Sequence, residues 1–352
     1  MECKIFKWSP HCLHWRLQLW QKMRKLIILI LLLTQVGCNN STVKLDNVEF
    51  PIEEQGEFEI IADSIMMSGF YGLYVYNDNL LVIALSKDGK LCHLFNKSTG
   101  DYISSSVNVG RANNEITFMF NYYINKENNE LKIYDQYCLK TFKISNDIVS
   151  YINTSEVIKA PYPTSIYELR DNYKLVHDHY HHIDNGHKRY RFALIKDDDA
   201  IVSSYNIRSY SENDEAYEFA YEQAPIAISD NRKRFAIGSL YGGIIEFFSY
   251  EDGKINNICK RHYINPKPRE DFYDVAKGYK FSSNDKFVIS PYNKLQVSSV
   301  PTQSIAIFDW DGNPQKLINT NQRIMVATIT DFDIIYALVE TDLGYAIAKI
   351  NA

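Results

Sequence analysis

The sequence predicts an all-β protein, a six-bladed β-propeller with four-stranded blades. Tyr, Phe, Val, Ile and Thr recur in short runs that suit strands rather than helices. Asp-Gly, Asn-Gly and Thr-Gly turns of the kind that close hairpins separate these runs. The turns that follow the third strand of each unit end at Gly100, Asp147, Asp198, Gly253 and Gly312, so successive ends lie 47, 51, 55 and 59 residues apart. A period of about 40 to 60 residues with four strands is typical of a propeller blade.

The first unit shows the pattern most completely. Its expected strands are 71–76, 80–85, 91–95 and 102–109, with turns at Asp88-Gly89 and Thr99-Gly100. One such sheet cannot bury its own faces, so it needs neighbouring sheets on both sides.

Comparable units are expected over 117–157, 163–208, 222–264 and 272–320. The last stretch has room for only three strands, at 324–330, 334–339 and 345–350. The segment 57–62 supplies a candidate strand that would complete this last blade and close the ring, which removes exposed sheet edges. The alternative is a pair of β-sandwiches, but it does not explain five similar units followed by a three-stranded end.

Several motifs resemble the TolB-like six-bladed β-propeller lipoproteins of Gram-negative bacteria. They are Ile305-Ala306-Ile307-Phe308-Asp309-Trp310-Asp311-Gly312-Asn313-Pro314, Tyr336-Ala337-Leu338, Gly238-Ser239-Leu240-Tyr241-Gly242-Gly243 and Gly110-Arg111-Ala112-Asn113-Asn114-Glu115-Ile116. Similar propellers often carry a Gly-Arg-Gly-Pro-Gly-Glu loop where this chain has Gly110 to Glu115. The resemblance covers nearly all of the chain after Cys38 and implies a propeller fold and a place in the cell envelope. It implies no catalytic residue, because propellers host binding, scaffolding and catalysis alike.

The start of the chain has the order of a lipoprotein signal peptide. Met23, Arg24 and Lys25 precede eight apolar residues at 26–33, and small Gly37 precedes Cys38. Basic residues hold the start on the cytoplasmic side, the apolar run enters the membrane, and Gly37 leaves room for processing. The sequence therefore predicts a lipid at Cys38 and a true translation start at Met23.

Two alternatives to lipidation stay open. A transmembrane anchor would need about 20 apolar residues, far more than this run offers. The second alternative is ordinary cleavage of the signal segment without attachment of a lipid.

The expected organisation is a signal segment at 1–38, a linker or tether at 39–55 and a single propeller at 56–352. No acidic residue occurs among Asn39, Asn40, Ser41 and Thr42, so we expect an outer-membrane anchor facing the periplasm.

The charge argues against some kinds of partner, and the cysteine content argues against a disulfide framework. The chain has a formal charge of −5, and the part after Cys38 has 32 basic and 42 acidic residues, a net charge of −10. An acidic domain disfavours binding to nucleic acid or to anionic lipid headgroups. Cys92, Cys138 and Cys259 are an odd and scattered set, typical of small apolar residues in strands rather than of a disulfide framework, although one pair among them stays possible.

Histidines form the densest group of possible metal ligands. In an extended strand, His177, His179 and His181 would project from one face, and three imidazoles can ligate zinc or another divalent metal. Same-face neighbours in one strand are about 7 Å apart, so one ion would need a bulge or a ligand from elsewhere. The alternative is an exposed hairpin beside Asn185-Gly186.

Three other groups have both a structural and a functional interpretation. Asp197, Asp198 and Asp199 could hold calcium but read as a solvated turn, because they lack EF-hand spacing. Arg232, Lys233 and Arg234 read as an exposed hairpin rather than an anion site. Trp310, between Asp309 and Asp311, could be a platform for sugar or peptide, but its place in an Asp-Gly hairpin favours a structural role.

The function expected from the sequence is a lipid-anchored envelope propeller that binds or scaffolds a protein, peptide or glycan partner at one mouth of the ring. No nucleic-acid partner and no cofactor are expected, unless the histidines hold a divalent metal. The alternative is a metal-dependent hydrolase or lyase that uses His177 to His182. A nucleophile elbow, a phosphate loop, a dinucleotide fingerprint and a His-Glu-x-x-His pair are all absent from the sequence.

Overall fold

The structure is a computed structural model, and it describes residues 49–135, 138–156, 165–177, 190–196, 200–206, 225–238, 244–262, 281–292 and 302–352. All of them belong to the unit Leu45–Ala352. The described residues form strands, turns and loops. They contain no helix of the length and apolarity needed to cross a membrane.

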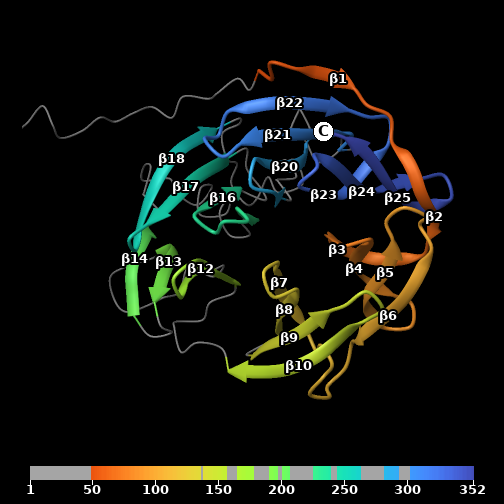
Figure 1. The fold of residues 1–352 in the computed structure, drawn as a ribbon, viewed down its shortest axis with the longest axis horizontal. Helices are drawn as coiled ribbons and strands as arrows, with labels where there is room; N and C mark the ends of the chain where they lie inside the picture. Colours follow the sequence, from red (N-terminus) through yellow and green to blue (C-terminus); the bar gives the residue numbers. More distant parts are fainter. Residues whose placement is uncertain are drawn as a thin grey trace, which may run out of the picture. The chain divides into compact units, whose positions relative to one another are not determined.

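Six small antiparallel sheets are arranged radially around a central axis, which confirms the six-bladed propeller (Figure 1). The alternative of paired sandwiches is wrong, because the described sheets follow one another around the axis and each packs against two neighbours rather than one. Blade 1 consists of β3 (Met67–Tyr76), β4 (Asn79–Ser86), β5 (Lys90–Asn96) and β6 (Tyr102–Asn108). Blade 2 consists of β7 (Met119–Asn125), β8 (Glu130–Asp135), β9 (Cys138–Ile144) and β10 (Val149–Glu156).

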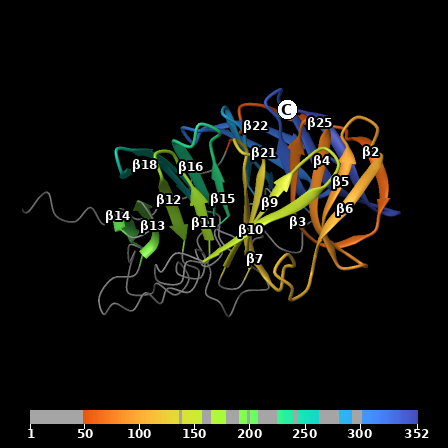
Figure 2. The ribbon, with the colours of Figure 1, turned by 60° about the horizontal axis from the view of Figure 1, so that its bottom comes forward.

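Blades 3 and 4 repeat this order from the centre outward (Figure 2). Blade 3 consists of β11 (Ser165–Glu168), β12 (Tyr173–His177), β13 (Tyr190–Lys196) and β14 (Ala200–Asn206). Blade 4 consists of β15 (Ile226–Ile228), β16 (Arg234–Gly238), β17 (Ile244–Glu251) and β18 (Lys254–His262).

Blades 5 and 6 combine strands from both ends of the described chain. Blade 5 consists of β19 (Ser282–Ser283), β20 (Phe287–Tyr292), β21 (Ser304–Asp309) and β22 (Pro314–Asn319), with β1 (Glu53–Gln55) as an outermost fifth strand. Blade 6 consists of β23 (Arg323–Ile329), β24 (Ile334–Thr341) and β25 (Gly344–Asn351), completed by β2 (Glu59–Ile65). The prediction that an early strand closes the ring is therefore confirmed.

The hydrophobic core is divided among the junctions between consecutive blades. One cluster joins Leu81 and Ile83 of blade 1 to Leu131 and Ile133 of blade 2, and another packs Phe192 of blade 3 with residues of blade 4. The other four clusters fill the remaining four junctions in the same way. Each blade thus buries its apolar faces against its two neighbours, which is why one blade could not be stable alone.

The N-terminal segment runs around the outer edge of two blades in succession (Figure 1). β1 pairs in parallel with β22 of blade 5, with Glu53 opposite Leu317, and β2 pairs antiparallel with β25 of blade 6, with Glu59 opposite Lys349. Between them, the amide of Gly56 donates to the carbonyl of Asn319 at 2.8 Å. We call Glu53–Ile65 the belt. The sequence predicted only its second half as a strand.

The belt crosses the junction between blades 5 and 6 at a tight point. A Cβ atom at Gly56 would collide with the side chains of Ile318 in blade 5 and Ile350 in blade 6. Phe58 is buried in the cluster that fills this junction. A larger residue here would require Ile318 and Ile350 to move, so glycine suits this close crossing of the two blades.

The three described cysteines are free thiols in β5, β9 and β18. Cys92 is buried among apolar residues, and this burial raises the pKa of its thiol. The absence of a disulfide among Cys92, Cys138 and Cys259 agrees with the sequence interpretation.

Candidate functional site

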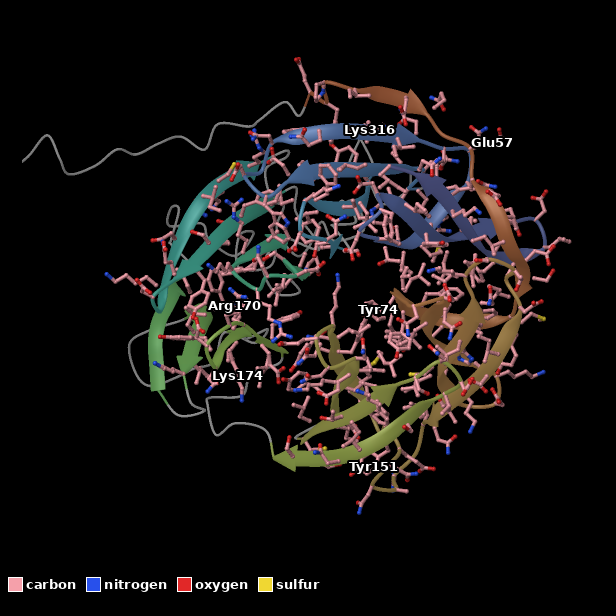
Figure 3. The ribbon with its side chains drawn as sticks, viewed as in Figure 1. Glu57, Tyr74, Tyr151, Arg170, Lys174 and Lys316 are labelled. Atoms are coloured by element: carbon pink, nitrogen blue, oxygen red, sulfur yellow. The ribbon has the colours of Figure 1, made fainter. Side chains whose placement is uncertain are left out.

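The innermost strands of the six blades, β3, β7, β11, β15, β19 and β23, surround a central channel (Figure 1). Residues of all six strands line a cavity of about 1690 Å³ in this channel. Tyr74 and Arg170 lie on the inner side of the ring, whereas Tyr151 and Lys316 lie on its outer side (Figure 3). A concave site of this kind, with polar groups from separate elements, is where a ligand is expected first.

The turns between the first and second strands all lie at one end of the channel, because consecutive strands of a blade run antiparallel. We call this end the hairpin mouth, and its turns are 77–78, 126–129, 169–172, 229–233, 284–286 and 330–333. Each turn carries at least one acidic residue, namely Asp78, Glu127, Asp171, Asp230, Asp285 and Asp331. Asp and Asn suit such turns because they tolerate left-handed backbone, as at Asn77 (φ 51°) and Asp171 (φ 58°). Among the six named carboxylates, left-handed backbone accounts for Asp171.

Lys126 extends from blade 2 across the hairpin mouth. Its Nζ forms an ion pair with Asp230 in blade 4 and lies 3.3 Å from the carbonyl oxygen of Ser283 in blade 5. Blades 2 and 5 are opposite members of a ring of six. The lysine side chain therefore spans the channel.

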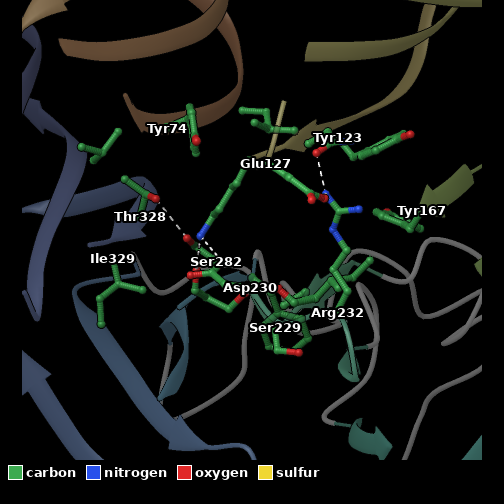
Figure 4. A pocket seen from close by; sticks show the side chains of 18 of the residues that line it. Tyr74, Tyr123, Glu127, Tyr167, Ser229, Asp230, Arg232, Ser282, Thr328 and Ile329 are labelled. Carbon is green, nitrogen blue, oxygen red and sulfur yellow. Dashed lines mark hydrogen bonds and ion pairs between the residues drawn. The ribbon is translucent and has the colours of Figure 1, made fainter. Parts of the chain in front are cut away.

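Arg232 extends in the reverse direction, from blade 4 to blade 2 (Figure 4). Its Nη2 donates to Asn125 Oδ1 at 2.5 Å and lies 3.3 Å from Glu127 Oε2. The Arg232 side chain is mostly buried, with 19% of its surface exposed. Two oppositely directed cationic arms, Lys126 and Arg232, thus connect blades 2 and 4 past blade 3.

Glu168 anchors this network at the end of the inner strand of blade 3. Its carboxylate pairs with Lys132 and accepts from Asn125 Nδ2 at 2.9 Å. Burial alone would raise the pKa of Glu168. The hydrogen bond and charge of Lys132, with the hydrogen bonds of Tyr123 and Asn125, outweigh burial and hold the pKa below its usual value. Glu168 is therefore an anion at neutral pH, and Asn125 links it to Arg232.

Two groups at the mouth have raised pKa values. Burial raises the pKa of Asp230, the charge of Lys126 opposes this, and the Asp285 and Asp331 carboxylates raise it further. Burial, followed by the charges of Asp230 and Asp331, raises the pKa of the Tyr74 hydroxyl to about 12. Groups with perturbed pKa values in a cleft mark a candidate site on physical grounds.

The network at the mouth is suited to noncovalent recognition. It offers cations, carboxylates, amides and hydroxyls on rigid strand ends, which can donate and accept hydrogen bonds. The described residues include no group of three or more His, Cys, Asp or Glu side chains that could hold a metal ion.

The sequence-predicted site residues mostly lie outside the described part of the chain. These are Cys38, His179, His181, and Asp197 to Asp199. His177 ends β12, where it pairs with Ser165 and Phe192, but only its backbone is described. The structure does not test the lipid site or the histidine metal site, and both stay predictions.

The structure decides two other interpretations. Trp310 is buried, and its Nε1 donates to the carbonyl of Asn284 at 2.9 Å, so the platform hypothesis is wrong and the structural role is confirmed. Residues 232–234 do lie at a hairpin between β15 and β16, where Lys233 is exposed and Arg234 keeps 41% of its side chain exposed. The interpretation as exposed is wrong only for Arg232, which enters the channel.

A buried ion pair holds the loop at Gly110 to Glu115. Asp135 and Lys140 are 2.7 Å apart, with 3% and 7% of their side chains exposed. Asp135 also accepts from the amides of Thr117 and Phe118, while Lys140 donates to the carbonyl of Glu115. This loop joins blades 1 and 2, and its backbone is fixed by charge-assisted hydrogen bonds.

The fold and the channel define the chain as a six-bladed β-propeller. No protein-family model and no curated protein sequence matches the chain. Solved structures do share its fold. A Bacteroides fragilis protein provisionally described as exported is 11% identical, with a TM-score of 0.58 over 85% of this chain and 98% of that chain. A member of the DUF4221 family from Bacteroides vulgatus is 9% identical, with a TM-score of 0.51 over 85% of this chain and 100% of that chain.

A calcium-binding protein, regucalcin from Agrobacterium tumefaciens, is 7% identical, with a TM-score of 0.50 over 86% of this chain and 97% of that chain. At these identities, the similarities concern the fold alone.

Proposed function

We propose that this chain is a lipid-anchored protein of the cell envelope whose propeller binds or scaffolds a partner through the hairpin mouth of its channel. The partner is an envelope protein, peptide or glycan. The lipid would be attached at Cys38, and residues 39–55 would connect it to the propeller, with β1 at their end.

Two observations support the envelope location. The order of basic residues, apolar run, Gly37 and Cys38 is that of a lipoprotein signal peptide. The Bacteroides fragilis protein that shares the fold is itself provisionally described as exported. Several acyl chains at Cys38 would give stable attachment to the outer membrane, because a single chain anchors only marginally.

The binding function rests mainly on the crossed arms of Lys126 and Arg232. Three blades contribute Asp230, Glu127 and Glu168 to the same network, although these residues are far apart in the sequence. A ring held together by apolar junctions does not require long cationic side chains across its channel. Convergent polar groups at a cavity are instead the usual mark of a ligand site.

A capture experiment tests this proposal. The purified full-length protein and a Lys126→Met, Asp230→Asn double variant are each incubated with envelope extract from the bacterium that encodes the chain, and bound proteins, peptides and glycans are identified. The double variant removes an ion pair without leaving one charge unpaired. Lys316→Met is the matched control, since Lys316 pairs with Glu54 on the outer edge. We expect a partner that wild type and control capture and that the double variant loses. Equal capture by all three would refute the channel as the binding site.

A further inference from the structure

The tyrosines that line the cavity are confined to one half of the channel. All five that the described residues contribute belong to blades 1 to 3, and they are Tyr71, Tyr74, Tyr122, Tyr123 and Tyr167. Tyr123 packs on Tyr167 with ring centroids 6.1 Å apart, and Tyr122 donates to the carbonyl of Tyr71 at 3.0 Å. These contacts fix several rings in place, so this half is a rigid aromatic wall.

Small hydroxyl side chains line the other half, together with the apolar residues Ile226, Ile228, Phe281, Ile329 and Phe332. All five Ser and Thr residues among the described lining belong to blades 4 to 6, and they are Ser229, Ser282, Ser283, Thr328 and Thr330. Ser282 and Thr328 hydrogen-bond to each other at 3.0 Å across the junction of blades 5 and 6. Figure 4 shows Ser282 and Thr328 on the side of the cavity away from Tyr123 and Tyr167. Ser229 already donates to Asn231 and Ser283 to the carbonyl of Ile228, so the hydroxyl oxygens of this half are chiefly available as acceptors.

The charges of the channel are largely matched within the protein. Lys126 pairs with Asp230, Arg232 with Glu127, and Lys97 with Asp78 at 3.3 Å. A charged ligand would compete with these internal partners, whereas a neutral ligand leaves all three pairs in place. The lining therefore favours a neutral ligand.

We propose that the channel binds a neutral saccharide chain, with C–H faces of its sugar rings against the tyrosine half and its hydroxyls toward the serine and threonine half. A sugar ring combines an apolar face with a rim of hydroxyls, and the two halves of the channel present the complementary surfaces. This inference rests on the proposed function, because it names the ligand class of the same site. An extended neutral peptide also carries paired donors and acceptors, but it lacks a repeated flat apolar face for the aromatic wall.

Binding of defined oligomers tests the saccharide. The full-length protein is titrated by calorimetry and by saturation-transfer NMR with maltohexaose, cellohexaose, xylohexaose and chitohexaose as neutral saccharides. Hexagalacturonate, hexalysine and a neutral hexapeptide of Ser, Ala and Gly are the comparison probes. We expect at least one neutral saccharide to bind more tightly than every comparison probe.

Variants then locate the bound saccharide. Tyr74→Ala should weaken it about tenfold, since stacking and burial of one aromatic ring have about this value. Ser282→Ala with Thr328→Ala tests the opposite half and should also weaken it. Tyr102→Ala is the matched control, because Tyr102 is an exposed tyrosine on the outer strand β6 and binding should not change.

The outcomes separate the two proposals. Tighter binding of the peptide or of a charged probe overturns the proposal of a saccharide ligand. Absence of binding by all four neutral saccharides overturns it as well. If the Lys126→Met, Asp230→Asn variant still loses an envelope partner in that case, the channel stands as a binding site and only its ligand class is wrong. If no envelope partner depends on the mouth either, both proposals fail.

Discussion

Lys126 and Asp230 form an ion pair although blade 3 separates their two blades. Lys126 also approaches the carbonyl of Ser283 in the blade opposite its own. A single side chain thus crosses the hairpin mouth, and the pair that fixes it is only partly buried, with 41% of Lys126 and 22% of Asp230 exposed. Such a pair contributes at most about 1 kcal/mol, so the arm can move aside for a ligand.

The first prediction concerns access to the channel. In a Ser282→Cys background, Lys126→Met should speed labelling of Cys at position 282 by a water-soluble thiol reagent about fivefold, the factor that corresponds to about 1 kcal/mol. Mass spectrometry of the peptide that contains position 282 measures the rate apart from the native cysteines. Lys316→Met serves as control and should leave the rate unchanged. An unchanged rate in Lys126→Met would show that the lysine does not limit access.

The second prediction concerns pH. The pKa of Asp230 is raised, first by burial, so its charge is lost at a higher pH than that of an ordinary aspartate, near 3.9. A carboxyl group whose pKa is higher in the folded than in the unfolded state stabilises the fold at pH below its unfolded-state pKa. This stabilisation disappears as pH rises through the folded-state pKa. Acidification should therefore free Lys126 while the propeller stays folded. The labelling rate of the Ser282→Cys protein, relative to that of its Lys126→Met derivative, should rise toward one as pH falls from 7 toward the ordinary aspartate value near 3.9. A constant ratio would contradict this coupling.

The third prediction concerns the buried pair of Asp135 and Lys140. Lys140→Met should lower the free energy of unfolding by about 3 kcal/mol, because it leaves a desolvated carboxylate without its cation. Urea unfolding measures this loss. Arg323→Met, which breaks the exposed pair with Glu340, should cost less than about 1 kcal/mol. Equal losses in the two variants would mean that burial does not determine how much each ion pair contributes to the free energy of unfolding.

The fourth prediction concerns the belt. Gly56→Val should lower the free energy of unfolding by about 1 to 3 kcal/mol, because its side chain would overlap Ile318 and Ile350. Urea unfolding and limited proteolysis between residues 50 and 66 should both report a loosened belt. Glu57→Val places the same side chain at an exposed neighbour and should have little effect. Full stability of Gly56→Val would show that the belt can shift outward without cost.

The fifth prediction concerns metal. We expect chelation to leave saccharide binding unchanged, since the described channel residues offer no metal cluster. The metal content of the purified protein tests the histidine site separately. Elemental analysis of wild type and of a His177→Ala, His179→Ala, His181→Ala variant measures this. One metal per chain that disappears in the triple variant would instead support the histidine site.

The fold was largely predictable because each blade repeats a local pattern. Alternation and turns near Gly100, Gly253 and Gly312 mark strands within a few residues, and the three-stranded last unit requires a strand from elsewhere. The predicted closing strand, 57–62, overlaps the observed Glu59–Ile65. β1 was missed because three residues of parallel pairing leave no periodic signal in the sequence.

The site was much less predictable, because its residues meet only when the ring closes. The sequence around Arg232 is typical of an exposed hairpin, and no residue near it in the sequence indicates Asn125 or Glu127 as partners. The available signal was the turns themselves, since first-to-second turns of every blade must gather at one mouth. Trp310 shows the opposite case, because its place in an Asp-Gly hairpin correctly favoured a structural role, and it fills a junction between blades.

Pairing of Glu59 with Lys349 also orders events during synthesis. β2 is synthesised among the first strands and its partner β25 among the last. The edge of β2 therefore stays unpaired while the other five sheets assemble. Contacts this distant in sequence form slowly, and unpaired edges invite aggregation in the interval. A truncation that removes only the final strand should therefore prevent formation of a soluble, closed monomer, even when the other blades fold.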